Sequence, residues 1–586
     1  MSVILESTMV TSIRPPRDGD SVPGEKLRLD ANECIGADSL SGIGIDRSPA
    51  MSFRYPDSGR LERLIADRAE IDPDRIVVTA GADDAIDRIC GACLESGSSV
   101  LIADPTFTML RAFAENRRAR VRTMPWMSGR FPTASFVDAS RGCDLVALVS
   151  PNNPTGLPIP VESLMAFRSA APDPVLLIDL AYIEFGCDAT GSDPRKIVEA
   201  LRWMPKTVMV RTLSKAWGLA GLRVGWTESA PDLATRIRAA GGPFPIAAAS
   251  IEIGCAVLSG VDSDRQVAER VRRVSANRSE IARTIEATGL DAGDSIGNFL
   301  LVSDPDRSGR GEWLADGLAG LDIMIRRFED RNLADRVRIT IPVGGKETAR
   351  LARGIATVLD PTAILFDLDG VLADVTDSYR VAIRDTAGEF GVEVTNADIE
   401  RIKSGGDAND DWEVTRRLLV ESGLDVAIED VIERFQRLYL GTADRTGLRE
   451  RERSLVDADR LAAAVGGRSI GVVTGRPRAE ARWFLERSGL ADLVEVLVAR
   501  EDAPLKPDPA GILKALAVSG AADAWFFGDT VDDMTAARRV SAGRVLPIGV
   551  DASPASSSRR PLIDAGAARV ITAGDSMIDL IEGTLS

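Results

Sequence analysis

The sequence predicts an α/β protein in which two separate sets of mostly parallel strands, each covered by helices, follow one another along the chain. Its 586 residues exceed what one hydrophobic core supports. Apolar runs such as RIVVTAG, DLVALVSP and PVLLIDLAY alternate with helical patterns such as RLERLIADRAEI, which is typical of a parallel sheet with helical connections. The alternation breaks at Pro361 and restarts with AILF, so we expect a second α/β unit there.

The first unit divides into two predicted domains. Residues 45–255 carry the regular alternation of strands and helices and predict a large α/β domain. Residues 256–360 begin with a long charged helix, carry short strands and close with a helix, which predicts a smaller α+β domain. We expect residues 1–44 to form an N-terminal arm that completes part of this small domain.

The second unit is interrupted by a charged helical stretch. AILF, SIGVVT and AWFFGD predict strands, so we expect an α/β core made of residues 361–376 and 456–586. The helical insert between them covers residues 377–455. Only a few residues separate the two units, which favours a short connection over a flexible linker.

Composition and charge narrow the class of partner. The formal net charge is −17 with no basic run, so the long-range field opposes binding to nucleic acid and to anionic membranes. We find no run of about 18 apolar residues that could span a bilayer, and the first ten residues lack the pattern of a secretory signal. The six cysteines match no disulfide framework of a small secreted protein. We expect a cytoplasmic protein that acts on small molecules.

The chain contains no histidine, the commonest general base and metal ligand. Catalysis must therefore use lysine, aspartate or tyrosine. Only eight of the 71 basic residues are lysines. Because arginine is the default cation here, a lysine in an apolar or glycine-rich setting is expected to serve for its amine chemistry.

The stretch VRTLSKAWGLAGLRVGW combines an amine with two phosphate-binding groups. An apolar strand is expected to deliver Ser214 and Lys215 into a glycine-rich turn, and Arg223 follows eight residues after the lysine. The amine can form a Schiff base, and the hydroxyl and guanidinium can hold a phosphate. Alone, this pattern more often belongs to a surface loop, so its meaning depends on other motifs.

Two of those motifs follow predicted strands. In TAGADDAI a strand runs into a helix through Gly81, Ala82 and Asp83, where backbone N–H groups can bind a phosphate. SPNNPTG holds Asn153 in a rigid turn after a buried strand. Each of these is common as an ordinary turn when it occurs alone.

A third motif, PVLLIDLAY, ends a very apolar strand with Asp179, and Tyr182 follows. A buried aspartate needs a cationic partner, and a protonated pyridine nitrogen is one. The order of these motifs resembles the fold type I aminotransferases, which use pyridoxal phosphate, and most closely the histidinol-phosphate aminotransferase family. The resemblance covers about residues 10–358 and rests on LRLDANEC, RYPDSG, DPTF, SPNNPTG, DLAY, RTLSKAWGLAGLRVG, GNFLLV and VRITI.

The resemblance assigns expected roles around the cofactor. It implies that Lys215 binds pyridoxal phosphate as a Schiff base and transfers the proton, while Asp179 pairs with the pyridine nitrogen. Asn153 and Tyr182 would bond the phenolic oxygen of the ring, and Phe107 would stack on the ring. The residues that would hold the cofactor phosphate are Gly81, Ala82, Asp83, Ser214 and Arg223.

The resemblance also implies a homodimer and a substrate site. Tyr55 would reach the cofactor phosphate of a neighbouring subunit. Arg338 would bind the α-carboxylate of the amino donor, and Arg326 would help to hold the phosphate end of the substrate. The chain departs from the family pattern at Phe107, where tyrosine is usual, at Leu180, where an acid is common, and at PFPIAAAS, where a block with asparagine is usual. The last departure bears on substrate specificity.

The second unit opens with AILFDLDGVLADV, which places Asp367 and Asp369 at the end of a buried strand. The spacing of the glycine and Val371 excludes an EF-hand loop, although an ordinary acidic turn would look the same. Complementary groups follow later in the chain: Thr474, Lys506, Asp529 and Asp533. Because ligands collect beyond the carboxyl ends of strands in open α/β sheets, we expect these groups to form one site.

This set resembles the haloacid dehalogenase superfamily over residues 362 to about 575. The resemblance implies that Asp367 attacks phosphorus, and that Asp369 protonates the leaving alkoxide and then activates water. It also implies Mg²⁺ bound by Asp367, by the backbone carbonyl of Asp369 and by Asp529, with Asp533 in support.

The remaining residues of that pattern would bind the substrate. The resemblance implies that Thr474 and Lys506 hold the phosphoryl oxygens. The helical insert would form a cap that covers the site. A second aspartate favours a phosphatase over a dehalogenase, which has no alkoxide to protonate.

Together the two resemblances imply a bifunctional enzyme of histidine biosynthesis. The first unit would transaminate histidinol phosphate with 2-oxoglutarate, and the second would remove the phosphate. The missing histidine fits this hypothesis loosely, although biased codon usage gives the same count. Two alternatives stay open, namely an aminotransferase for an aromatic amino acid and a phosphatase for another small metabolite. A third, in which the second unit is a binding module without turnover, is disfavoured by its intact acids and Lys506.

Overall fold

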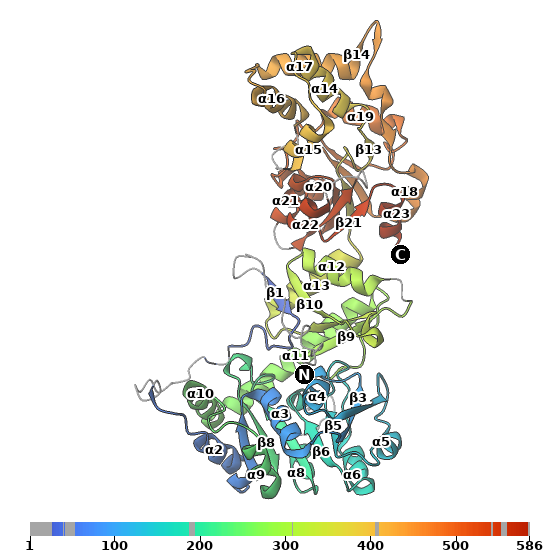
Figure 1. Cartoon of the computed structure of the whole chain (residues 1–586). Helices are drawn as coiled ribbons and strands as arrows, with labels where there is room; N and C mark the ends of the chain where they lie inside the picture. Colours follow the sequence, from blue (N-terminus) through green and yellow to red (C-terminus); the bar gives the residue numbers. More distant parts are fainter. Residues whose placement is uncertain are drawn as a thin grey trace, which may run out of the picture.

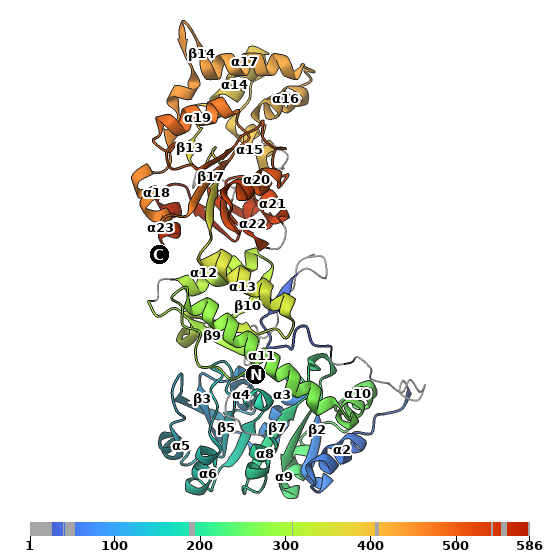
Figure 2. The same ribbon diagram turned by 180° about the vertical axis from the view of Figure 1, so that it is seen from behind.

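The computed structural model describes residues 26–38, 40, 53–186, 194–306, 309–404, 410–540, 543–551 and 559–583. Figure 1 shows three bodies stacked along one axis, and Figure 2 shows the same order from behind. Each body combines helices with a sheet, so the predicted α/β class is confirmed.

The body at one end is a seven-stranded sheet in the order β2-β8-β7-β6-β5-β3-β4. Neighbouring strands are parallel except at β8, which runs antiparallel to β2 and β7. The strands are β2 (Ile76–Thr79), β3 (Ser99–Asp104), β4 (Arg120–Pro125), β5 (Leu145–Val149), β6 (Val175–Asp179), β7 (Thr207–Thr212) and β8 (Gly225–Ser229). The helices are α2 (Gly59–Ala69), α3 (Gly81–Cys93), α4 (Thr108–Asn116), α5 (Thr133–Ala139), α6 (Val161–Ala170), α8 (Pro194–Arg202), α9 (Pro231–Ala239) and α10 (Ala248–Ser259). Because the central strands are buried on both faces, they appear in the sequence as unbroken apolar runs.

The middle body has a four-stranded sheet in the order β1-β10-β11-β9. Its strands are β1 (Leu27–Leu29), β9 (Phe299–Ser303), β10 (Ile323–Arg327) and β11 (Arg336–Thr340), with helices α11 (Ser263–Glu286), α12 (Arg310–Gly320) and α13 (Gly345–Leu359). Leu27 lies opposite Ile323, so a strand from the start of the chain forms the edge of this sheet. The arm residues 1–25 and 41–52 lie outside the described residues.

The third body begins with a six-stranded, wholly parallel sheet in the order β18-β17-β12-β19-β20-β21. Its strands are β12 (Ala363–Phe366), β17 (Ser469–Val473), β18 (Val496–Val498), β19 (Ala524–Gly528), β20 (Val545–Asp551) and β21 (Arg569–Thr572). Its helices are α18 (Ala458–Val465), α19 (Arg478–Arg487), α20 (Ala510–Ser519), α21 (Val531–Arg539), α22 (Arg559–Asp564) and α23 (Asp575–Glu582).

A helical cap completes the third body. It contains α14 (Tyr379–Glu389), α15 (Asn396–Ser404), α16 (Asp411–Glu421), α17 (Ile428–Leu440) and a short hairpin of β14 (Gly441–Thr442) and β15 (Arg445–Thr446). The two connections between cap and core run side by side as the antiparallel pair β13 (Ala373–Asp374) and β16 (Arg453–Ser454). In both views the cap lies at the end of the molecule farthest from the seven-stranded sheet.

Two tryptophans pack against each other where the middle body meets the third. The rings of Trp313 in α12 and Trp525 in β19 meet edge to face, with their centroids 5.2 Å apart. The indole nitrogen of Trp525 donates to the carbonyl of Thr357 at 2.8 Å, and the Thr357 hydroxyl donates to Asp523 at 3.1 Å. Both tryptophans belong to one hydrophobic cluster that runs through the two bodies. The connection at residues 360–362 is therefore embedded in a packed junction.

Ion pairs flank this junction and show which face of the parallel sheet it uses. Arg569 pairs with Asp316 at 2.6 Å, and Arg538 pairs with Asp322 at 2.8 Å. Arg569 is the first residue of β21, and Trp525 lies near the start of β19. The middle body therefore covers the amino ends of the parallel strands, whereas their carboxyl ends point toward the cap.

No described helix has the length and apolar character needed to cross a bilayer. Five cysteines lie in the described ranges and none of them forms a disulfide, while Cys187 lies outside those ranges. Burial raises the pKa of Cys90 to about 12, which makes it an unreactive core thiol.

We predict that Trp525→Ala destabilises the protein through this junction. The change removes a buried ring, its edge contact with Trp313 and the hydrogen bond to Thr357, and such losses cost about 3–5 kcal/mol. The midpoint of urea denaturation, followed by circular dichroism, should fall clearly. Trp203→Ala is the matched control because Trp203 is 71% exposed. Equal midpoints for the two variants would contradict the role of the junction.

Candidate active sites

The predicted residues of the first unit gather at the carboxyl-end edge of the seven-stranded sheet. Asp179 is the last residue of β6, Asn153 follows β5, Phe107 follows β3, and Lys215 follows β7. Since β5, β6 and β7 are neighbours in the sheet, their ends lie next to one another.

A candidate phosphate cradle, formed by Gly81, Asp83, Ser214 and Arg223, lies at the start of α3. Gly81 has φ +80°, which favours glycine, and a Cβ there would lie 2.5 Å from Nη2 of Arg223, so a larger residue would displace the guanidinium. Arg223 also contacts Asp83 at 3.1 Å and the hydroxyl of Ser214 at 3.4 Å. Ala82 lies between these groups in the first turn of α3. A helix N-terminus, a hydroxyl and a guanidinium thus converge, which suits a phosphate.

Asp179 is a buried carboxylate that forms no ion pair within the described ranges, although the charge of Lys215 is close enough to act against the rise of its pKa. Its side chain accepts one hydrogen bond, from the backbone N–H of Ala181 at 2.9 Å. Burial raises the pKa of Asp179 to about 7, because removal from water disfavours the charged form. A cation placed against this carboxylate would reverse that effect, as a protonated pyridine ring would.

Lys215 lies beside residues from the N-terminal part of the chain. Its Nζ donates to the carbonyl oxygens of Ala31 and Asn32, each at 3.3 Å, and lies 5.5 Å from the ring centre of Tyr182. The side chain of Asn32 donates to the Tyr182 hydroxyl at 3.0 Å and accepts from Thr340 at 3.1 Å. Asn32 therefore ties the lysine and the tyrosine together. Asn32 lies in the block LRLDANEC, but the sequence alone predicts no role for it.

Two arginines of the middle body lie side by side at the same site. Arg326 on β10 is the register partner of Arg338 on β11. Arg338 is buried and donates to the side-chain oxygen of Asn153 at 2.6 Å and to the carbonyl of Asp30 at 2.7 Å. Burial lowers the pKa of Arg338 to about 10, and the charge of Arg326 adds to this effect. Two adjacent guanidiniums favour an anionic substrate.

Tyr55 differs from the other predicted residues because it lies on the surface of this chain. Its side chain is 79% exposed and its ring stacks on Phe244 with centroids 4.3 Å apart. Phe107 is half-buried at the start of α4 and packs against the core of the large sheet.

The second set of predicted residues gathers at the carboxyl ends of the central strands of the six-stranded sheet. Asp367 follows β12, Thr474 follows β17 and Asp529 follows β19, and these three strands are neighbours. Thr474 is buried, and its hydroxyl oxygen accepts from the N–H of Arg476 at 3.1 Å.

Lys506 connects two of the predicted acids. Its Nζ lies 2.7 Å from Asp367 and 2.5 Å from Asp533, and it donates to the carbonyl of Val473 at 3.2 Å. Burial alone would lower the pKa of Lys506, but the two carboxylates raise it, so the amine stays charged. The other oxygen of Asp533 accepts from the N–H and hydroxyl of Thr530, which caps α21. Both oxygens of Asp533 therefore have partners, which suits a supporting position.

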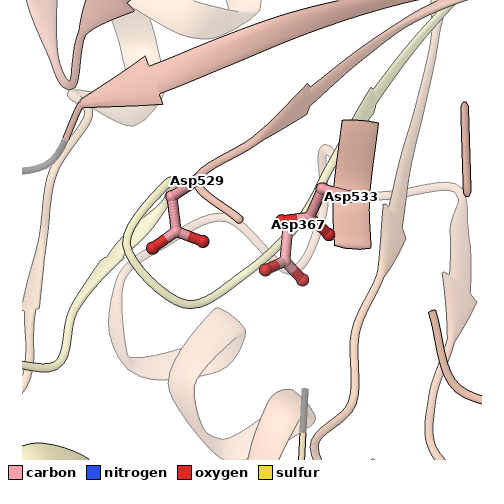
Figure 3. Close-up of side chains that lie close together, drawn as sticks. All are labelled: Asp367, Asp529 and Asp533. Atoms are coloured by element: carbon pink, nitrogen blue, oxygen red, sulfur yellow. The ribbon is translucent and has the colours of Figure 1, made fainter. Parts of the chain in front are cut away.

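Figure 3 shows Asp367, Asp529 and Asp533 turned toward one another, each with a carboxylate oxygen within 4.8 Å of the others. Burial raises the pKa of Asp367 to about 7, and burial together with the neighbouring acids also raises the pKa of Asp529. Gly370 lets its loop approach, since a Cβ there would lie 2.2 Å from Asp529. Three carboxylates beside the single amine of Lys506 leave excess negative charge, so a divalent cation fits here.

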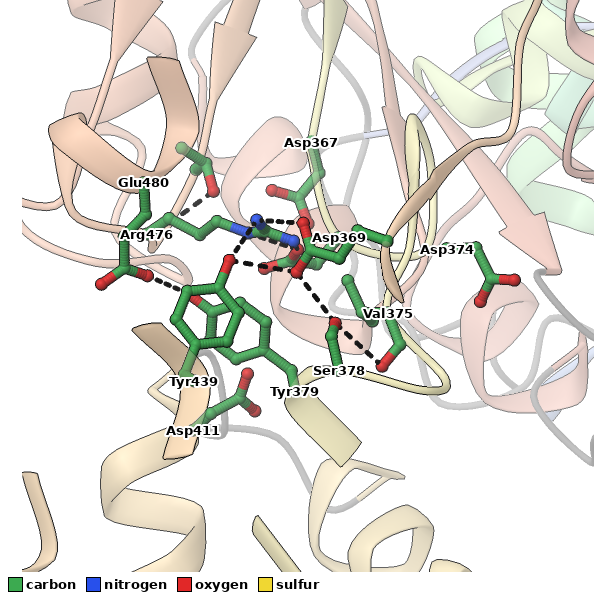
Figure 4. Close-up of polar contacts among 12 residues, drawn as sticks. Asp367, Asp369, Asp374, Val375, Ser378, Tyr379, Asp411, Tyr439, Arg476 and Glu480 are labelled. Atoms are coloured by element: carbon green, nitrogen blue, oxygen red, sulfur yellow. Dashed lines mark hydrogen bonds and ion pairs between the residues drawn. The ribbon is translucent and has the colours of Figure 1, made fainter. Parts of the chain in front are cut away.

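The side chain of Asp369 lies apart from this cluster and contacts Arg476 instead. The Nε of Arg476 donates to Oδ1 of Asp369 at 2.6 Å (Figure 4). The metal contact through the backbone carbonyl of Asp369, which the resemblance implies, stays a prediction, and the carboxylate of Asp369 is held by Arg476. Arg476 was missed by sequence reasoning, although it lies two residues after Thr474 in the turn TGRP.

A cap residue was also missed. Lys403, at the end of α15, forms an ion pair with Asp411 at 2.8 Å. Burial lowers its pKa, but Asp411, Asp529 and Asp369 outweigh burial, so the pKa of Lys403 is raised. The cap therefore presents a cation toward the acids of the core.

Comparison with known proteins decides the family. The family profile described as "Aminotransferase class I and II" matches residues 45–355. The chain belongs to the aminotransferase class I and II family. The profile described as "Haloacid dehalogenase-like hydrolase" matches residues 364–545, so this aminotransferase carries a hydrolase-like domain at its C-terminal side. The predicted fusion is confirmed.

Individual relatives agree with the resemblance. A histidinol-phosphate aminotransferase of Aeromonas hydrophila is 32% identical over 308 residues, which are 51% of this chain and 83% of that protein. The crystal structure of histidinol-phosphate aminotransferase from Sinorhizobium meliloti in complex with pyridoxal-5'-phosphate is 26% identical with a TM-score of 0.52, over 57% of this chain and 90% of that one.

A third relative has a different name. An "Imidazoleglycerol-phosphate dehydratase" of Phytophthora nicotianae is 44% identical over 189 residues, which are 31% of this chain and 42% of that protein. The matched stretch is thus about as long as the hydrolase-like region 364–545, and it spans less than half of the relative.

We predict that Gly81→Ala weakens the binding of pyridoxal phosphate to this aminotransferase at least tenfold, or by about 1.4 kcal/mol. The new Cβ would displace Arg223 and strain a backbone with φ +80°. Titration of the apoenzyme with the cofactor, followed by visible absorbance, measures the change. Gly242→Ala is the matched control because a Cβ there meets nothing within 4 Å. Unchanged affinity in Gly81→Ala would refute the cradle.

Proposed function

We propose that this chain is a bifunctional enzyme of histidine biosynthesis. Its aminotransferase part would interconvert histidinol phosphate and 2-oxoglutarate with the corresponding ketone phosphate and glutamate. Its hydrolase part would release inorganic phosphate from histidinol phosphate with Mg²⁺. The observation that carries the proposal is the joining of a region related to histidinol-phosphate aminotransferases to a hydrolase-like region in which Lys506 pairs with Asp367.

Two further observations support a shared substrate. The adjacent Arg326 and Arg338 give the first site a positive charge suited to a substrate that carries a phosphate and to a donor that carries a carboxylate. The third relative bears the name of an enzyme that acts on another imidazole phosphate. Similarity to both names is expected if this chain acts on imidazole phosphates.

In the transamination, pyridoxal phosphate would supply the electron sink for the carbanion at the amino acid Cα. Arg223, Ser214 and the start of α3 would hold its phosphate, and Asp179 would keep its pyridine nitrogen protonated. Lys215 would attach the cofactor and carry the proton from Cα. Arg338 would orient the donor through its carboxylate. We also propose a homodimer, in which the exposed Tyr55 reaches the phosphate site of the second subunit.

In the hydrolysis, an oxygen of Asp367 would attack phosphorus and form an aspartyl phosphate while the ester bond to the alcohol breaks. Asp369 would give its proton to the leaving alkoxide, then take one from the water that cleaves the aspartyl phosphate. Lys506 and Thr474 would hold the phosphoryl oxygens. Asp367, the carbonyl of Asp369 and Asp529 would hold Mg²⁺, which neutralises the phosphoryl charge.

We predict that two single substitutions separate the activities. Lys215→Ala should abolish glutamate formation from histidinol phosphate and 2-oxoglutarate and remove the visible absorption of the bound cofactor, yet leave phosphate release intact. Asp367→Asn should do the opposite, with phosphate release lowered by at least a thousandfold. Chelation of Mg²⁺ should act like Asp367→Asn.

The substrates used in these assays test the alternatives. Faster turnover of an aromatic amino acid than of histidinol phosphate would favour the aromatic aminotransferase. Absence of phosphate release from histidinol phosphate, with release from another phosphomonoester, would overturn the shared substrate. Phosphate release that survives Asp367→Asn would show that Asp367 is not the nucleophile of the hydrolase site.

We further predict that histidinol phosphate passes between the two sites through solvent. The junction covers the amino ends of the six parallel strands, and the hydrolase residues lie at their carboxyl ends under the cap, on the side away from the aminotransferase site. ¹⁵N-glutamate and the ketone phosphate, mixed with excess unlabelled histidinol phosphate, should give histidinol with the same ¹⁵N fraction as the bulk histidinol phosphate. Mass spectrometry measures both fractions, and a higher fraction in histidinol would demonstrate direct transfer.

A further inference from the structure

The guanidinium of Arg476 contacts one carboxylate oxygen of Asp369 (Figure 4). Its side chain is 1% exposed, whereas that of Asp369 is 23% exposed. Its Nε and Nη2 both contact Oδ1 of Asp369. Within the described ranges the structure gives Oδ2 of Asp369 no hydrogen-bond or ion-pair partner. One oxygen is thus fixed while the other stays available.

The opposite side of the guanidinium is held by residues of the cap and its connections. Nη1 of Arg476 lies 2.9 Å from Glu452 and donates to the Tyr439 hydroxyl at 3.1 Å. The ring centre of Tyr379 lies 4.6 Å from the guanidinium carbon. Glu452, which is fully buried, also accepts from Ser378 at 2.8 Å. Ser378 and Glu452 lie on the two connections between cap and core, so both connections help to fix Arg476.

Charge and shape explain why an arginine stands here. A buried guanidinium is costly unless it is paired, and Asp369 and Glu452 supply a carboxylate on each side. The planar guanidinium of Arg476 contacts both carboxylates at fixed angles, so the position of Glu452 helps to set the position of Asp369. Rotation of the Asp369 side chain away from Asp367 would break the contact of Oδ1 with Nε and Nη2.

We propose that Arg476 is a positioning residue that aims the free oxygen of Asp369 at the leaving oxygen of the phosphomonoester. This inference rests on the proposed phosphatase activity, in which Asp369 gives a proton to the alkoxide. The proton moves from Asp369 to the ester oxygen as the bond between that oxygen and phosphorus breaks, and Arg476 itself exchanges no proton. Residues of the cap and its connections hold Arg476 in place. The cap that covers the site therefore also orients Asp369 for proton transfer.

The test compares two leaving groups. An alkoxide needs a proton as it leaves, whereas 4-nitrophenolate leaves without one, so a fault in proton delivery affects only the first. In Arg476→Met we expect kcat for a primary alkyl phosphate such as ethanolamine phosphate or histidinol phosphate to fall at least a hundredfold, the usual size of general acid catalysis. For 4-nitrophenyl phosphate the fall should stay below fivefold. Arg476→Lys, which keeps the charge but loses the fork, should recover only part of the alkyl phosphate activity.

Matched variants separate positioning from structural support. Tyr439→Phe removes a hydroxyl that also contacts Arg476 and keeps the ring, so both substrates should be affected equally and weakly. Glu452→Gln removes the charge that anchors the far side of Arg476 and should reproduce the selective loss in smaller measure. If Arg476→Met fails to fold, judged by circular dichroism, Arg476→Lys and Glu452→Gln decide the question by the same ratio of the two substrates.

The outcomes distinguish this inference from the proposed function. Equal losses for both substrates in the Arg476 and Glu452 variants would overturn the positioning role and leave a structural one. A selective loss in Asp369→Asn that is absent from Arg476→Met would also overturn it while supporting the phosphatase. A wild-type protein that hydrolyses neither substrate with Mg²⁺ would instead refute the phosphatase itself.

Discussion

Buried carboxylates at the ends of apolar strands govern both halves of this protein. Asp179 ends β6, and Asp367 and Asp529 follow β12 and β19, all removed from most of their contact with water. An ionised carboxylate in such a place is stable only beside a positive charge. The two halves meet this demand differently. Among the described residues, the first gives Asp179 one backbone hydrogen bond, which suits a cationic ring, and the second combines a lysine with acids that could hold a metal ion.

The direction of the strands then decides how the two halves can be joined. Parallel strands place every such site at the carboxyl-end edge, so the amino-end edge is free to serve as a docking face. The third body uses it in this way, with Trp525 and Arg569 against the middle body and the acids on the opposite edge. The cap can therefore cover the hydrolase site without disturbing the junction. The same arrangement keeps the two sites apart.

Sequence reasoning found the residues that belong to local motifs and missed those that act through long-range packing. Lys215 and Asp367 stand in turns that follow recognisable strands, and both lie where such turns converge. Asn32 contacts Lys215 across 183 positions, and Arg476 contacts Asp369 across 107. No local sequence pattern predicts such pairs, because asparagine and arginine are common in turns that have no functional role. The fold class was predictable for the same reason, since alternation of apolar runs and helices is a local signal repeated along the chain.

The chain has no histidine, and its lysine and arginine side chains have different roles in the hydrolase-like site. Lys506 is a point charge that contacts Asp367, Asp533 and a carbonyl at once without fixing their angles, which suits a site that would bind and release a phosphoryl group under the proposed function. Arg476 presents a rigid plane to Asp369 and Glu452, and so fixes an orientation. If proton transfer falls to aspartate and lysine, as we propose, such fixed orientation matters more than usual, because a carboxylate has freely turning oxygens where an imidazole ring has set directions. The guanidinium of Arg476 gives the Asp369 carboxylate the directional control that the ring would have provided.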